Sequence, residues 1–369
     1  MPNHTLGSHD YVQTLKGQKL RFPDFDGLVQ GWPQGINPNF EAVKEVHEER
    51  LKALLGPGKR LDILIHATKT AHLAATWWPT ASFDALLFAA DLAAWITNQA
   101  GLQMYIWDDE LDSPELSDLH RDWVGGEQLR HKTIEYLGAA LSETPRGEDD
   151  TARTDNVPVT LASFAPVAKV ATSRMAPGPR RLFLHELVRS VEAAGVEQLS
   201  ELSGLAPSLD EYMEIRMRTC AAAPISATID IGIRFMNNVD LGDEIRAHPC
   251  VQQIHEEISC VIALTNDVFS LKRELKNPFY NNVIAVLYHQ HHDLQTAVDK
   301  TYEMVKSSIE RLLAAEARLL ELFLGRREDL PAFFGGAKTM ITGNITWSIQ
   351  NERYGLGISK CDGTTEVVI

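Results

Sequence analysis

An acidic stretch at residues 108–112 (DDELD) follows an apolar and aromatic run (MYIW) at residues 104–107. If this stretch is helical, Asp108 and Asp112 lie four residues apart and share one face of the helix, one turn from each other. The two carboxylates repel each other, and hard divalent cations such as Mg²⁺ favour oxygen ligands of this kind. A solvated acidic helix end is the alternative interpretation. The pair alone is therefore moderate support for a metal site.

A second oxygen-rich stretch, residues 266–274 (NDVFSLKRE), lies within a long segment of apolar helical periodicity. Asn266, Ser270 and Glu274 step by four, which places a carboxamide oxygen, a hydroxyl and a carboxylate along one helix face over about two turns. Ordinary helix surface is the alternative, but Asn and Ser are poor choices for a helix interior. Something other than helix propensity placed them, and three oxygen donors in a row suit a metal.

Together the two stretches resemble the motifs of class I terpene synthases of the microbial, fungal-like, single-domain kind. That family pairs a DDxxD-like motif with a downstream (N/D)Dxx(S/T)xxxE motif, an arginine at a helix break before the second motif, and an Arg-Tyr pair near the C-terminus. Here Arg216, three residues before Thr219, and the pair Arg353-Tyr354 fit the last two places. The resemblance covers residues 36–354, which is nearly the whole chain.

The resemblance implies a set of metal ligands. In such enzymes the first aspartate of the acidic motif binds Mg²⁺, which maps to Asp108, while Asp109 and Asp112 more often orient or support it. Three Mg²⁺ ions are expected by resemblance, with Mn²⁺ as a substitute. The predicted metal ligands are Asp108, Asp112, Asn266, Ser270 and Glu274.

The resemblance also implies contacts to a diphosphate. Arg273 stands where the family commonly has lysine, which keeps the charge but replaces a point donor by a planar fork. Arg216 aligns best with the diphosphate-sensing arginine, and Arg218 is the alternative. Arg353 and Tyr354 complete the set.

One departure from the family pattern follows Thr219. Where the family usually has an arginine doublet and then a glycine, this chain has Arg216-Met217 and Cys220-Ala221. By resemblance, the backbone carbonyl near Cys220 approaches the bond that is cleaved, and a carbonyl does not depend on its own side chain. We therefore count Cys220 with Arg216 and Tyr354 as the predicted catalytic residues.

A prenyl diphosphate needs a cationic mouth for its head and an apolar bowl for its tail. Metal ions and arginines stabilise the charge that develops on the leaving diphosphate, and aromatic faces stabilise the carbocation that remains. Core packing is the alternative for every aromatic candidate. Tyr105, one turn before Asp108, and Trp347, nearly two turns before Arg353, are favoured by position. The aromatic candidates are Trp78, Phe88, Tyr105, Phe235 and Trp347.

The elements that must position these residues are helices, because a period near 3.6 dominates the chain. We predict an all-α, single-domain bundle around a central active-site cavity. The Ser208–Glu211 capping box predicts a helix over residues 209–218, stopped or bent at Pro224, and another long helix begins at Pro249. Residues 144–158 and 176–179 are predicted to be loops, and Trp78-Pro79 a helix start. Residues 36–357 form the predicted domain, flanked by a partly flexible segment at 1–35 and a tail at 358–369.

Composition excludes several classes. The net charge is −15 with no basic cluster, which argues against a nucleic-acid partner. Residues 83–101 are apolar but carry Asp84 and Asp91, so no membrane span is predicted. Four scattered cysteines and no secretory leader favour the cytosol. The run HQHH at residues 289–292 lacks zinc-ligand spacing, and no dinucleotide, P-loop or nucleophile-elbow motif is present.

The sequence therefore predicts a Mg²⁺-dependent cyclase that ionises a prenyl diphosphate, and the resemblance favours farnesyl diphosphate as the substrate and a sesquiterpene as the product. Geranylgeranyl diphosphate remains an alternative substrate, and a homodimer remains open. A chain-elongating prenyltransferase would be expected to carry a second aspartate-rich motif where Asn266, Ser270 and Glu274 stand. A helical binding protein without catalysis would tolerate Asp108→Ala and Asn266→Ala.

Overall fold

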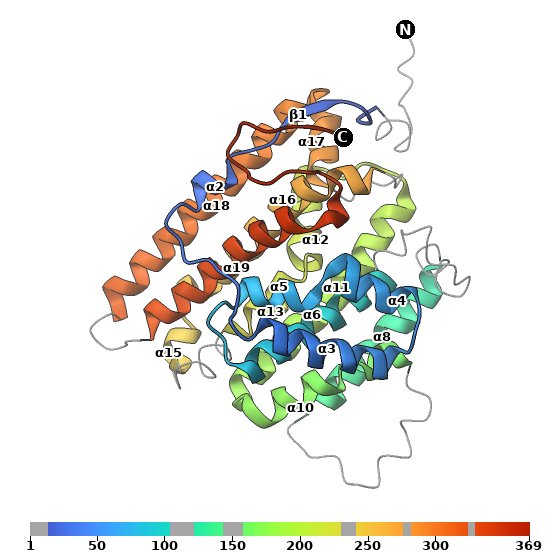
Figure 1. Cartoon of the computed structure of the whole chain (residues 1–369), viewed down its shortest axis with the longest axis vertical. Coiled ribbons are helices and arrows are strands. Elements are labelled where there is room, and N and C mark those ends of the chain that lie inside the picture. The colour runs from blue at the N-terminus through green and yellow to red at the C-terminus, as the bar shows by residue number, and fades with distance from the viewer. Residues whose placement is uncertain (1–13, 104–121, 143–157, 230–240, 276–281, 324–328) are drawn as a thin grey trace.

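The computed structural model describes residues 14–103, 122–142, 158–229, 241–275, 282–323 and 329–369. These residues are helical almost throughout, which confirms the all-α prediction (Figure 1). The helices and strands, in chain order, are β1 (Lys19–Arg21), α2 (Phe25–Leu28), α3 (Phe40–Leu55), α4 (Lys59–Asp62), the π-helix η1 (Ile63–Thr68), α5 (Thr70–Trp77), α6 (Phe83–Gln103), α8 (Trp123–Ala140), α9 (Val159–Ala162), α10 (Ala165–Arg174), α11 (Pro177–Ser203), α12 (Leu209–Thr219), α13 (Ala222–Ser226), α15 (Gly242–Arg246), α16 (Pro249–Glu274), α17 (Val283–His291), α18 (Leu294–Phe323), α19 (Leu330–Gln350), the 3₁₀-helix η3 (Glu352–Tyr354) and β2 (Glu366–Val368).

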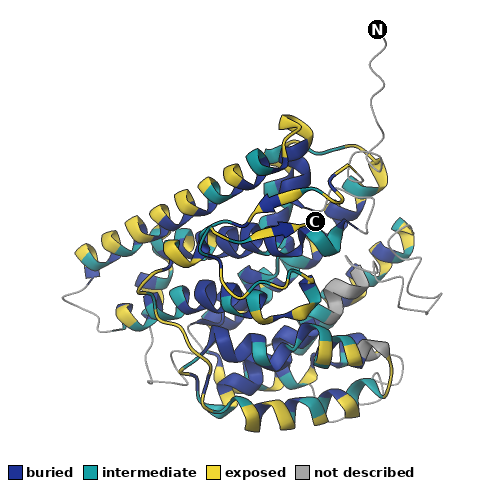
Figure 2. Cartoon of the chain, turned by 45° about the horizontal axis from the view of Figure 1, so that its top comes forward, coloured by how far each residue is buried: buried dark blue, intermediate teal, exposed yellow. Residues whose placement is uncertain are grey.

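The long helices pack in a closed ring. α16 contacts α19, α19 contacts α5, and α5 contacts α6; α13 joins α6 to α11, and α12 joins α11 back to α16. α3 covers α5 and α6 from one side, while α18 covers α16 from the other. Figure 2 shows the consequence: the described residues of α5, α6, α16 and α19 are mostly buried, whereas α18 and α3 are exposed along their outer faces. This ring is the arrangement expected of a bundle built around a central site.

The hydrophobic pattern of each helix explains its place. In α18 the apolar and small residues recur at three- and four-residue steps, from Leu294 and Ala297 to Leu319 and Phe323, and these are the buried ones. A single apolar stripe of this kind covers one neighbour and leaves the other face to water. α5 is buried from Thr70 to Trp77 except at His72, as expected of a helix enclosed on several sides.

Gly343 brings α19 close to α5. A Cβ at this position would lie 2.4 Å from the carbonyl oxygen of Thr76, so only glycine allows the two helices to approach this far. The close contact fixes the part of α19 that carries Trp347 one turn later. The close approach of α19 to α5 at Gly343 therefore helps to fix the position of Trp347 relative to α5.

Two predictions about the ends of α12 are tested here, and the first is confirmed. Ser208 and Glu211 form the capping box that begins α12, with Ser208 accepting from the Glu211 amide and Glu211 accepting from the Ser208 amide. The predicted stop at Pro224 is wrong, because α12 ends at Thr219 and Pro224 lies inside α13. The chain turns earlier, at Ala221, where φ is 61°.

Two other interpretations of proline are corrected. Residues 176–179 are not a loop: Ala176 is the N-cap of α11, and Pro177 and Pro179 lie in its first turn. Proline is tolerated there because the first amides of a helix have no intrahelical acceptor. Trp78 is not at a helix start but is the C-cap of α5, and the next helix begins at Phe83.

Two short strands join residues near both ends of the sequence. β1 pairs with β2 in antiparallel register, with Lys19 opposite Val368. The pair brings the predicted N-terminal segment and the predicted C-terminal tail together, and Phe22, just after β1, packs on Phe269 of α16 with ring centroids 5.1 Å apart. Among the described helices, none combines the length and apolar character that crossing a membrane requires.

Candidate active site

The site is organised around Asp267, near the C-terminal end of α16. Its side chain is fully buried. The Tyr212 hydroxyl donates to Oδ2 at 2.6 Å, Arg216 Nε donates to Oδ1 at 2.9 Å, and the Val283 amide donates to Oδ2 at 3.0 Å. Burial raises the pKa of Asp267, and the Arg216 guanidinium opposes that shift. One carboxylate thus ties α12, α16 and α17 together.

Arg216 connects Asp267 to the predicted metal ligand Asn266 by hydrogen bonds. Its second nitrogen donates to Asn266 Oδ1 at 2.9 Å, and Asn266 Nδ2 in turn donates to the Tyr354 hydroxyl at 2.9 Å. Arg216 is only 5% exposed. The structure therefore brings Arg216, Asn266 and Tyr354 together, although they lie on α12, α16 and η3.

Ser270 and Glu274 follow Asn266 along α16 as the four-residue step requires. Glu274 Oε2 accepts from Asn282 at 2.9 Å, and Glu274 Oε1 lies 3.8 Å from Arg273. The Ser270 hydroxyl is buried, and within the described part of the chain it has no hydrogen-bond partner. An unsatisfied buried oxygen between an amide and a carboxylate suits a hard divalent cation, so these residues fit the metal that the motif predicts.

Glu197 of α11 faces the same cluster and was not predicted. The pKa of its carboxyl is raised to about 8, chiefly by burial and also by the neighbouring carboxylates Glu201, Asp267 and Glu274, while Arg216 opposes the shift. At neutral pH Glu197 therefore keeps its proton and adds no negative charge beside Arg216. Arg216 is therefore paired with one carboxylate, Asp267, rather than with two.

The second predicted arginine, Arg353, is held by η1. Its guanidinium donates to the Thr68 hydroxyl at 3.1 Å and lies over the rings of Tyr354 and Trp347, at 5.6 and 6.0 Å from their centroids. Trp347 Nε1 and Asn351 Nδ2 donate to the Thr68 carbonyl at 3.1 and 3.3 Å. Trp347 and Tyr354 meet edge to face at 5.8 Å. Thr68 thus orients both Arg353 and Trp347.

The turn after α12 carries the departure from the family pattern. Cys220 ends the helix, and Ala221 follows in the left-handed conformation, with φ 61° and ψ 6°. A non-glycine residue there is strained, and strain of this kind gathers at functional sites. The Cys220 thiol lies 3.7 Å from the Ser259 carbonyl, and burial raises its pKa, which disfavours the thiolate form.

Other predicted residues are separate from this cluster or lie outside the described part. Trp78 is buried beside Trp77, with ring centroids 5.8 Å apart, and Phe88 packs on Phe183 at 6.4 Å. No described contact joins either ring to the Asp267 cluster. Five predicted positions lie outside the described residues: Tyr105, Asp108, Asp109, Asp112 and Phe235.

Several residues that build the site were missed from the sequence. Asp267 stood inside the quoted motif, and an acidic residue in the middle of an apolar helix was a usable signal. Tyr212 stood one turn before Arg216, but no spacing rule shows which helix it faces. Glu197, Asn282 and Thr68 carried no local signal, because their roles depend on packing between distant segments.

The arrangement is chemically specific. A buried arginine is oriented by one carboxylate, and an amide, a hydroxyl and a carboxylate follow along one helix face, with a second arginine and a tyrosine at the same end. Such a set can hold a metal-bound polyanion at the mouth of a helical bundle.

Several solved structures have a fold similar to that of this chain. The chain superposes on an ancestral reconstructed protein, SVS_A2, with a TM-score of 0.69 at 20% identity, covering 90% of this chain and 91% of the other. It superposes on hedycaryol synthase with a TM-score of 0.67 at 20% identity, covering 89% and 98%. The fold is that of the class I terpene synthases.

The family assignment follows from the sequence. The model of the family described as "Terpene synthase family 2, C-terminal metal binding" matches residues 103–311, more than half of the chain, and the chain belongs to this family. It is 26% identical to the sesquiterpene cyclase hepA of Aspergillus oryzae over 368 residues, covering 96% of this chain and 95% of that protein. The chain is therefore a terpene synthase, and its family implies use of a divalent metal.

Proposed function

We propose that this terpene synthase is a Mg²⁺-dependent sesquiterpene cyclase that acts on farnesyl diphosphate. The observation that carries the proposal is the hydrogen-bonded chain Asp267–Arg216–Asn266–Tyr354 beside the unsatisfied Ser270 hydroxyl. The relative that matches nearly its whole length is described as a sesquiterpene cyclase.

The reaction begins at the allylic C–O bond. That bond breaks with its electron pair leaving on the diphosphate, and the remaining cation closes a ring before losing a proton or taking up water. Bound Mg²⁺ supplies Lewis-acid stabilisation of the departing charge, and Asn266, Ser270 and Glu274, with Asp108 and Asp112 as proposed partners, would hold it.

The protein's own side chains act around that step. Arg216, fixed by Asp267, donates to the departing diphosphate, and Arg273 and Arg353 add positive charge. The Tyr354 hydroxyl donates a further hydrogen bond. The Trp347 ring, held by the Thr68 carbonyl, faces Tyr354 and presents a π surface that stabilises a passing carbocation.

The test is a product assay on the purified chain with Mg²⁺ and three prenyl diphosphates of ten, fifteen and twenty carbons. We expect a volatile hydrocarbon or alcohol and released diphosphate from the fifteen-carbon substrate, with EDTA stopping both. Product from the twenty-carbon substrate alone would replace the sesquiterpene assignment by a diterpene one. No product above a boiled control from any of the three would refute the cyclase proposal.

Two neighbouring arginines provide a matched pair of variants. Arg216 is buried against Asp267, whereas the Arg218 side chain is 43% exposed and pairs with Glu214 at 3.4 Å. Arg216→Ala should reduce diphosphate release by about a hundredfold or more, as loss of one preorganised donor does. Arg218→Ala should leave it close to wild type. The reverse order would assign the sensing role to Arg218.

A further inference from the structure

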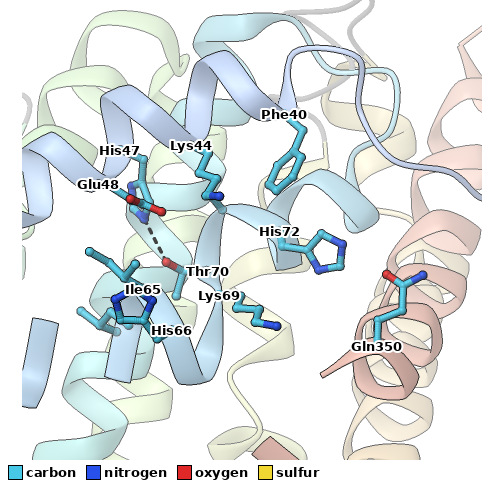
Figure 3. Close-up of a pocket in the computed structure, with 12 residues that line it drawn as sticks. Phe40, Lys44, His47, Glu48, Ile65, His66, Lys69, Thr70, His72 and Gln350 are labelled. Atoms are coloured by element: carbon cyan, nitrogen blue, oxygen red, sulfur yellow. Dashed lines mark hydrogen bonds between the residues drawn. The ribbon is translucent and has the colours of Figure 1, made fainter. Parts of the chain in front are cut away.

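A cavity lies on the outer side of the ring. It has a volume of about 500 Å³ and opens between α3, η1, the first turn of α5 and the end of α19 (Figure 3). Among the described residues, none of those predicted to bind metal, diphosphate or hydrocarbon lines it. The cavity is therefore distinct from the cluster around Asp267.

The lining of this cavity is cationic although the chain as a whole is acidic. Lys44 of α3, Lys69 and His72 at the start of α5, and His66 of η1 surround the opening in Figure 3. Neither lysine has an ion-pair partner within the described part of the chain. Glu48 is the acidic residue of the lining, and its carboxylate lies 4.0 Å from Lys52.

The pKa of His72 responds to the positive charge of the two lysines. Its pKa is lowered, first by partial burial and then by Lys69 and Lys44. Burial alone lowers the pKa of a histidine, and the two lysines add to that shift because like charges disfavour the imidazolium. The two ammonium groups thus generate a positive potential where an anion would enter.

The backbone at Lys69 adds to the same potential. Lys69 lies between the π-helix η1 and α5 in the left-handed conformation, with φ 54° and ψ 55°. Non-glycine residues in this conformation and single π-turns both gather at functional sites. Thr70, Ala71 and His72, the first turn of α5, line the cavity, and the first amides of a helix carry partial positive charge.

One side of the cavity is apolar and the floor is already ordered. Phe40, Leu64 and Ile65 supply the apolar side, and the Phe40 ring meets His72 edge to face at 5.5 Å. At the floor His47 Nε2 lies 2.9 Å from the Thr70 hydroxyl, the hydrogen bond that is dashed in Figure 3. A ligand with an anionic head and a hydrocarbon part would match both sides.

We propose that this cavity is a second binding site, for a small organic phosphate with an apolar group. Lys44 and Lys69 contact the phosphate, and the surface around Phe40 and Ile65 covers the apolar group. The site adjoins the active site through one residue, because Thr68 precedes Lys69 and holds both Arg353 and Trp347. The inference does not depend on which prenyl diphosphate the enzyme cyclises.

The test is calorimetric binding of geranyl monophosphate to the full chain in EDTA. Lys44→Gln/Lys69→Gln should weaken binding at least about tenfold, since two charge-assisted hydrogen bonds are lost. Lys300→Gln/Lys306→Gln on α18 removes the same charge from exposed positions and should not change it. Because Lys44 is exposed on α3, the single variant Lys44→Glu should fold and also weaken binding. Equal affinity in all variants would overturn the proposal.

Two further readouts locate the ligand and define its class. Hydrogen exchange should slow at residues 40–48 and 63–72 when geranyl monophosphate binds; protection confined to residues 209–219 and 266–274 would place the ligand in the active site and refute the second site. Inorganic phosphate should bind at least about fivefold more weakly, because it lacks the apolar group. Equal affinity for both probes would refute the apolar part of the recognition.

Discussion

Two buried aspartates, Asp267 and Asp91, each join neighbouring helices of the bundle. Comparing them distinguishes a carboxylate that organises the candidate active site from one that only stabilises the fold. Asp267 joins α12, α16 and α17; Asp91 joins α6 to α3, accepting from His47 at 2.8 Å and Arg50 at 2.7 Å. Both side chains are nearly inaccessible, at 0% and 7% exposed. Each carboxylate therefore organises a set of donors from neighbouring helices.

The arginines differ. The Arg216 side chain is 6% exposed, whereas that of Arg50 is 42% exposed. Arg216 continues from Asp267 to Asn266, which donates to the Tyr354 hydroxyl, while within the described part of the chain Arg50 forms a hydrogen bond with Asp91 alone. The buried Arg216 is held in place by Asp267 and also donates to a predicted ligand, so it is a preorganised donor. The half-exposed Arg50 mainly neutralises the charge of Asp91.

The largest effect is expected at Asp267. Asp267→Asn should cost about 3–5 kcal/mol of unfolding free energy, because Arg216 is left buried without its carboxylate. Diphosphate release should fall by about a hundredfold in the fraction that is folded, since Arg216 is no longer oriented. Urea unfolding and a release assay at equal folded concentration measure the two losses. A stable, active variant would remove Asp267 from the centre of the site.

The next effect is a pH dependence that comes from Glu197. Its pKa of about 8 in the folded chain exceeds the ordinary value of 4.5. Below pH 4.5 both folded and unfolded states are protonated. Between that pH and about 8 only the unfolded state releases the proton, so the folded state loses stability as pH rises. Glu197→Gln should therefore gain stability relative to wild type as pH rises through this range.

Urea unfolding in EDTA at several pH values measures that gain. Glu192→Gln, on the exposed face of the same helix, is the matched control and should show no such trend. A constant difference between Glu197→Gln and wild type across the range would show that Glu197 ionises normally in the folded state.

A smaller and purely structural effect is expected at the second aspartate. Asp91→Asn should cost about 1–3 kcal/mol, because the amide keeps one acceptor oxygen but loses the carboxylate that accepts from both His47 and Arg50. Product formation per folded molecule should stay at the wild-type level. If this variant were as inactive as Asp267→Asn, the division between a catalytic and an architectural aspartate would fail.

The smallest effect is expected at Arg50. Arg50→Gln should cost less than about 1 kcal/mol, because a half-exposed ion pair gains little in water. Thermal unfolding at low and high salt checks this, and the small difference from wild type should shrink further as salt screens the pair. A large, salt-independent loss would show that Arg50 is as embedded as Arg216.

The predictable part of the site is the part that lies on one helix. Asn266, Ser270 and Glu274 share a face of α16 because of the helical repeat alone, and the capping box at Ser208 fixed where α12 begins. The meeting of Arg216 with Asn266 was expected only from family resemblance. It depends on how α12 packs on α16, which no local spacing contains.

The wrong expectations share a cause. Proline and glycine at residues 176–179 were interpreted as a loop, and Pro224 as a helix stop, yet Pro177, Pro179 and Pro224 all lie near the starts of helices. The break after α12 fell instead at Ala221, whose type gives no hint of a left-handed conformation. Tertiary packing, rather than local preference, selected that turn.

The pairing of β1 with β2 has a consequence for how the protein is made. The amide of Ile369 donates to the Gln18 carbonyl at 3.0 Å, so residues separated by almost the entire sequence must meet. During synthesis, β1 emerges first and has no strand partner until β2 leaves the ribosome. Until then the strand pair cannot hold Phe22 against Phe269 of α16, so this contact is secured late in synthesis.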